Sequence, residues 1–175
     1  YPRKPYTIGG SGCGEVGMCN LLIEIPKYAK YTPKTIYSYM VQFAVAGDGT
    51  KRSGIVEAMR HYGFTHVTQI GSRPMTDVWS LMSKGYIGLF VMNSNLAGSR
   101  RIRWTTSGHY IAVVAYKVKD GKHYVYCKDS GWRNHVGWYC YETSMRGAVS
   151  DAIIGLPPKS VVKKPSKAEQ ISKMD

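Results

Sequence analysis

A cysteine between two glycines, in the segment Ser11-Gly12-Cys13-Gly14, is the first residue of the chain that could do chemistry. A helical pattern starts there, and the positive end of a helix dipole favours the thiolate of a cysteine at that position. The glycines would let a substrate backbone approach, and backbone N–H groups at a helix start can face a developing oxyanion. Taken alone, Cys13 is equally explained as a small buried residue, because free cysteines are often buried.

A histidine and an aspartate could complete such a site. His109 follows a glycine and opens the most apolar strand pattern, over 109–118, and Asp129 ends the pattern over 123–128. An Asp-Gly turn signal joins the two patterns into a hairpin, so Asp129 should lie beside His109. A carboxylate there would orient the imidazole through one nitrogen, while the other nitrogen serves Cys13 as a base. Alone, each is explained as a strand or turn residue.

The order Cys, His, Asp is the one that papain-like cysteine peptidases use on a helix-and-sheet scaffold. The chain resembles those related to bacteriocin-processing peptidases in three segments, GGSGCGEVGMCNLL, LMSKGYIGLFVM and SGHYIAVVAYKVKDGKHYVYCKDSG, within residues 5–156. It is most similar to endolysin-like cell-wall hydrolase domains of Gram-positive gut bacteria and their phages. The resemblance implies Cys13 as nucleophile, His109 as general base and Asp129 as orienting carboxylate, with no metal or organic cofactor.

The oxyanion position departs from that family, which usually carries a Gln several residues before the Cys. No Gln precedes Cys13, and Thr7 stands six positions upstream, where papain-like enzymes have the Gln. Ser11 is nearer. Either hydroxyl could donate to the oxyanion, or the backbone N–H groups could act without a side chain.

The remaining histidines, cysteines and tryptophans are expected to pack or to lie on the surface. A tryptophan near the presumed cleft would line a substrate groove or pack in the core. The residues concerned are His61, His66, His123, His135, Cys19, Cys127, Cys140, Trp104, Trp132 and Trp138. The cysteines show no spacing typical of a zinc site.

Length and composition indicate one globular domain, because 175 residues with 43% hydrophobic content can bury a sizeable core. The net charge of +13 favours anionic partners such as an acidic cell-wall polymer. No nucleic-acid module accompanies the charge, so we expect no nucleic acid as partner. No apolar run is long enough for a membrane span, and no signal peptide is visible at the start. We expect a monomer.

The pattern of elements predicts an α+β fold, with N-terminal helices packed on a mostly antiparallel sheet, and the resemblance implies that this fold is papain-like. In the first helix, Val16, Cys19, Leu22 and Ile23 predict one buried face. Residues 1–157 would form the peptidase domain, and the Lys-, Ser- and Pro-rich residues 158–175 a linker toward a further C-terminal module. The expected helices are 13–24, 33–43, 53–63 and 75–84, and the expected strands 66–70, 86–92, 109–118, 123–128, 136–141 and 152–156.

These features favour a cysteine peptidase that hydrolyses peptide or amide bonds of bacterial peptidoglycan. It would act at the bacterial wall after secretion or phage-mediated lysis. One alternative is the same chemistry on leader peptides or other proteins. A second alternative, from another class, is a non-catalytic basic module that binds the wall, for which loss of Cys13 would change nothing.

Overall fold

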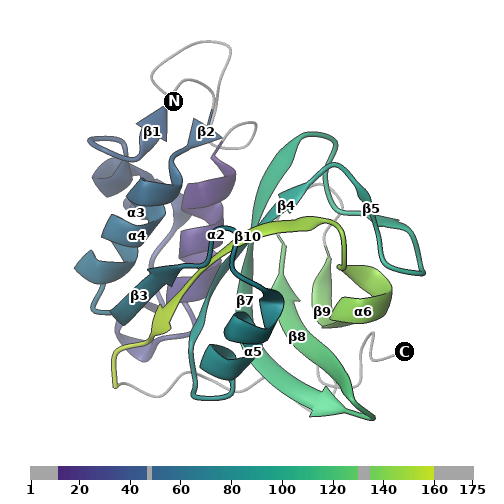
Figure 1. Cartoon of the computed structure of the whole chain (residues 1–175). Coiled ribbons are helices and arrows are strands. Elements are labelled where there is room, and N and C mark those ends of the chain that lie inside the picture. The colour runs from purple at the N-terminus through teal and green to yellow at the C-terminus, as the bar shows by residue number, and fades with distance from the viewer. Residues whose placement is uncertain (1–11, 47–48, 130–134, 160–175) are drawn as a thin grey trace.

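The computed structural model describes residues 12–46, 49–129 and 135–159, and its centre is a six-stranded sheet (Figure 1). Every neighbouring pair is antiparallel, in the order β3-β10-β4-β7-β8-β9. The strands are β3 (Thr65–Gln69), β4 (Ile87–Asn93), β7 (Gly108–Lys119), β8 (Lys122–Lys128), β9 (Val136–Cys140) and β10 (Val149–Leu156). The α+β architecture predicted from the sequence is therefore confirmed.

Helices cover both faces of this sheet and bury a hydrophobic core on each side. On one face lie α2 (Cys13–Leu22), the short 3-10 helix η1 (Pro26–Tyr28), α3 (Pro33–Met40) and α4 (Arg52–His61). On the other face lie α5 (Met75–Met82) and α6 (Tyr141–Ser144). Two strand pairs stand apart from the main sheet: β1 (Val45–Ala46) with β2 (Gly49–Thr50), and β5 (Leu96–Ala97) with β6 (Ile102–Arg103).

The local signals that predicted the helix ends act as expected. Thr32 caps α3, because its hydroxyl accepts a hydrogen bond from the Thr35 amide and Pro33 takes the first helical position. Gly63 follows α4 with a φ of +90°, which a glycine adopts without strain. Within the described residues, no helix is long and apolar enough to cross a membrane.

Helix α2 differs from its prediction, because it has no single buried face. Met18 and Leu21 are completely buried, whereas Val16 and Ile23, which were predicted to be inward, are half-buried. The reason is its central position: α2 contacts β4 and β7 of the sheet as well as α3 and α4 (Figure 1). A helix packed on several sides buries residues all around its axis.

The hairpin of β7 and β8 forms as the Asp-Gly signal predicts. Asp120 and Gly121 both have positive φ, which matches the right-handed twist of the strands they connect. Ala112 pairs with Lys128, so the start of β7 and the end of β8 lie at the same end of the sheet.

On the other side of β7, the order of strands in the sheet does not follow the sequence, because β10 lies between β3 and β4.

Candidate active site

Cys13 is the first residue of α2, directly after the N-cap Gly12. The helix ladder starts with the Val16 amide donating to the Gly12 carbonyl at 2.9 Å. In an α-helix, amides earlier in the first turn have no partner within the helix, and such a helix start can face a negatively charged group. All four cysteines are free, and Cys13 is half-buried while Cys19, Cys127 and Cys140 are buried.

The glycine after Cys13 serves packing, which differs from the expectation that it makes room for a substrate. Gly14 is buried, and a Cβ placed there would lie 2.5 Å from the Cβ of Thr50. That is far inside van der Waals contact. Gly14 therefore lets β2 lie directly against the helix that carries Cys13.

His109 and Asp129 meet at the sheet edge where β7 begins and β8 ends. His109 Nε2 lies 2.6 Å from Asp129 Oδ1, and the Asp129 side chain is completely buried. This contact leaves Nδ1 as the ring nitrogen available to Cys13. The structure thus brings together the three side chains that the sequence singled out, from a helix start, a strand start and a strand end.

The electrostatics of His109 depend on both neighbours. Burial lowers the pKa of His109, but hydrogen bonds with Asp129 and Cys13, together with the charges of both, raise it to about 9. The ordinary value for histidine is 6.5. His109 therefore stays an imidazolium at neutral pH, which is the protonation state that pairs with a thiolate.

A second histidine contacts the same carboxylate. His135 Nδ1 lies 3.1 Å from Asp129 Oδ2, and its ring packs on Trp104 with 4.4 Å between ring centroids. Sequence reasoning assigned His135 a packing or surface role and missed this contact. A signal existed, because His135 directly precedes a predicted strand whose antiparallel partner ends at Asp129.

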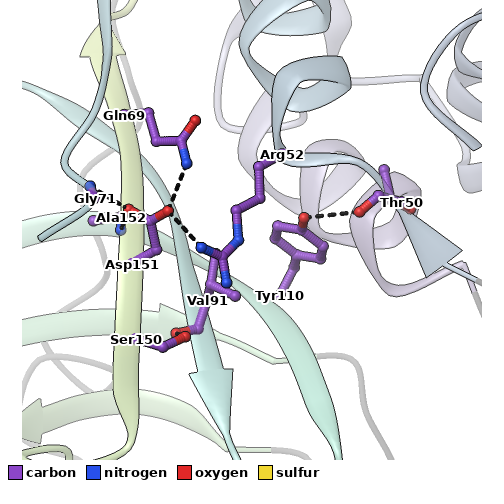
Figure 2. Close-up of polar contacts among 9 residues, drawn as sticks. All are labelled: Thr50, Arg52, Gln69, Gly71, Val91, Tyr110, Ser150, Asp151 and Ala152. Carbon is purple, nitrogen blue, oxygen red and sulfur yellow. Dashed lines mark hydrogen bonds and ion pairs between the residues drawn. The ribbon is translucent and has the colours of Figure 1, made fainter. Parts of the chain in front are cut away.

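Thr50 joins the helix that carries Cys13 to the strand that carries His109. Its hydroxyl donates to Oε2 of the buried Glu15 at 2.8 Å. Its carbonyl accepts from the Tyr110 hydroxyl at 2.9 Å, as Figure 2 shows. Burial and the nearby Cys13 raise the pKa of Tyr110, so its phenol remains a donor. These contacts fix the Cys13 end of α2 relative to β7.

A buried carboxylate holds the segment that contains Thr50. Asp151 of β10 accepts hydrogen bonds from Arg52 at 2.9 Å, from Gln69 at 2.7 Å and from the Gly71 amide at 2.7 Å (Figure 2). Arg52 begins α4, two residues after Thr50. The cluster around Asp151 therefore ties α4 to β3 and β10.

Several predicted residues have other roles or lie outside the described part of the chain. Trp104 and Trp138 are buried, so both belong to the core. Thr7, Ser11, Trp132 and residues 160–175 of the expected linker are outside the described residues. Among the described residues, no three His, Cys, Asp or Glu side chains are grouped to hold a metal ion.

Comparisons with known proteins bear on the fold. No protein-family model matches the sequence, and no curated protein does. Among solved structures, the chain is similar to the crystal structure of a candidate C39-like peptidase from Bacillus anthracis. The TM-score is 0.50 and the sequence identity 12%, over 93% of each chain. At that identity the likeness shows the fold alone.

Proposed function

We propose that this protein is a cysteine peptidase that cleaves peptide or amide bonds of bacterial peptidoglycan. The observation that carries the proposal is the grouping of Cys13, His109 and Asp129: His109 Nε2 lies 2.6 Å from Asp129 Oδ1, and Cys13 is near enough to help raise the pKa of His109. A nucleophile, a base and a group that orients the base are the parts that covalent hydrolysis requires. The fold shared with a candidate peptidase agrees with it.

The reaction follows from the protonation states of the pair. The Cys13 thiolate attacks the carbonyl carbon of the scissile bond, and amides of the first turn of α2 face the resulting oxyanion. The His109 imidazolium gives its proton to the leaving amine, which leaves an acyl thioester on Cys13. A water molecule then attacks the thioester and gives a proton to His109. Departure of the acid product restores the thiolate and imidazolium.

The choice of substrate rests on charge and on the family resemblance. Arg100, Arg101 and Arg146 are exposed, and a hydrogen bond from the Arg100 amide to the Thr143 carbonyl holds their two segments together. Arg100 and Arg101 lie between β5 and β6, and the next strand after β6 is β7, which contains His109. A basic surface there, on a chain of net charge +13, would concentrate the enzyme on a wall rich in phosphate and carboxylate.

The proposal is tested by incubating the protein with purified Gram-positive peptidoglycan and identifying the products by mass spectrometry. New amino termini within the stem peptide or cross-bridge are expected. Hydrolysis of the amide bond between the lactyl group and the stem peptide would instead indicate an amidase. An intact wall together with cleavage of a double-glycine leader peptide would favour the leader-peptidase alternative. Wall binding with no cleavage of either substrate would favour the non-catalytic module.

Selective alkylation is a first prediction. Iodoacetamide at mildly acidic pH should modify Cys13 well before the other three cysteines, because the imidazolium of His109 stabilises its thiolate. Burial raises the pKa of the Cys19 and Cys127 thiols, and Cys140 is also buried. Peptide mapping of the alkylated protein measures the order. Slower modification of Cys13 than of Cys19 would contradict the proposed pair.

The alkaline limb of the pH profile is a second prediction. The pKa of His109 is raised, so the imidazolium and the stability it contributes are fully present below about 6.5 and are lost as pH rises through about 9. We expect kcat/KM to fall with that midpoint. Asp129→Ala removes one cause of the raised pKa, so its alkaline limb should move to lower pH. An unchanged limb in that variant would show that Asp129 does not set the charge of His109.

A further inference from the structure

The carboxylate that orients His109 is itself held between two imidazoles. Asp129 Oδ1 faces His109 Nε2 at 2.6 Å, and Oδ2 faces His135 Nδ1 at 3.1 Å. Lys128 pairs with Val136 across β8 and β9, so the register places Asp129 and His135 opposite each other. Both carboxylate oxygens thus have an imidazole nitrogen within hydrogen-bonding distance.

The position of His135 is fixed from its other side by the core. Its ring centroid lies 4.4 Å from that of Trp104 and 5.8 Å from that of Tyr139. Trp104 is only 1% exposed and donates its indole N–H to the Ser144 carbonyl at 2.7 Å. A ring held in this way approaches Asp129 in one orientation.

We propose that His135 is a positioning residue of the peptidase, which holds the Asp129 carboxylate so that it orients His109. The inference rests on the proposed function. A carboxylate accepts from a neutral imidazole only where the nitrogen carries a proton, so His135 donates through Nδ1–H. This bond fixes the rotation of the carboxylate, which keeps Oδ1 on His109 Nε2 and Nδ1 toward Cys13. His135 touches neither the substrate nor the reacting atoms.

Three substitutions separate the hydrogen bond from the packing. His135→Asn keeps a donor at the place of Nδ1, His135→Leu has nearly the same size as Asn without a donor, and His135→Phe keeps the ring on Trp104 without a donor. Loss of a hydrogen bond to a charged group should lower kcat about 10- to 100-fold in the Leu and Phe variants, with KM little changed. The Asn variant should retain kcat within about threefold, because its donor is preserved.

A matched control exists on the same sheet. His123 also meets a carboxylate, with Nδ1 2.5 Å from Glu142 Oε1, and stacks on Trp79 at 4.8 Å between centroids. It pairs with Val118 at the hairpin end of β8, whereas Asp129 follows the opposite end of that strand. His123→Phe should therefore leave kcat unchanged, which excludes a general effect of removing a histidine–carboxylate pair.

Alkylation of Cys13 gives a readout that needs no substrate. At mildly acidic pH, its rate should fall in the Leu and Phe variants and stay near wild type in the Asn variant. If circular dichroism shows that the Phe variant does not fold, the comparison of the Asn and Leu variants tests the role of His135 by itself. Equal kcat and alkylation rates in those two would overturn the role of His135. The proposed function would be overturned instead if, in the wild-type protein, Cys13 were not alkylated and no substrate were cleaved.

Discussion

Replacing Cys13 by alanine is expected to abolish the lysis of purified Gram-positive walls while the protein stays folded. The reaction needs a nucleophile that forms the thioester, and no other described cysteine is exposed enough to replace it. The loss in kcat should reach roughly four to six orders of magnitude, because only binding and oxyanion contacts remain. Turbidity of a wall suspension measures lysis, and circular dichroism measures the fold.

Cys19→Ala is the matched control, because Cys19 lies on the same helix and is buried, with its thiol donating to the Tyr31 carbonyl at 3.5 Å. It should retain lysis. Binding of Cys13→Ala to walls should also persist and should weaken with salt, since attraction by distributed charge is screened over about 8 Å at physiological ionic strength. Undiminished lysis by Cys13→Ala would refute the mechanism.

His109→Ala should be as severe as Cys13→Ala, and the double variant should be no worse than either alone. The two residues form one unit: the thiolate is stabilised by the imidazolium, and the same imidazolium supplies the proton for the leaving amine. Removing one member therefore removes the contribution of the other. Single-turnover rates on a soluble wall fragment would compare the three variants at equal concentration.

Two further measurements test the separate roles of His109 and Asp129. Alkylation of Cys13 in His109→Ala should slow at mildly acidic pH, because the thiolate loses its cation. Asp129→Ala should reduce kcat less than either substitution, because Asp129 orients the base and takes no part in bond making. If the fold-loss in rate of the double variant instead equalled the product of the two single fold-losses, Cys13 and His109 would act independently, and the proposed proton transfer would be wrong.

Much of the fold was predictable because its signals are local. The capping threonine of α3, the glycines after α4 and α5 and the Asp-Gly turn each determine a boundary through their own backbone preferences. The small pairs β1–β2 and β5–β6 and the short helix α6 were not predicted. Each is only two to four residues long, which is too short for a periodic pattern, and tertiary contacts decide such segments.

The candidate site was predictable to the extent that one hairpin positions it. An antiparallel turn places the start of β7 beside the end of β8, so His109 and Asp129 could be paired from sequence. The same reasoning applied to β8 and β9 would have placed His135 near Asp129, but five residues separate the two, and a connection longer than a two-residue turn does not fix the register of the next strand. The contacts of Thr50 with Glu15 and Tyr110 join segments 35 and 60 residues apart, and no local pattern encodes them.

β10 is the last strand that the structure describes, and it lies between β3 and β4. The six-stranded sheet is therefore incomplete until residues 149–156 have been synthesised. Until then, β3 and β4 each present an open row of backbone donors and acceptors, which can pair with other chains. Contacts between such distant segments also slow folding. A nascent chain that stops before β10 would contain Cys13, His109 and Asp129 but lack the Asp151 anchor of α4, so it would carry every reactive group without an assembled site.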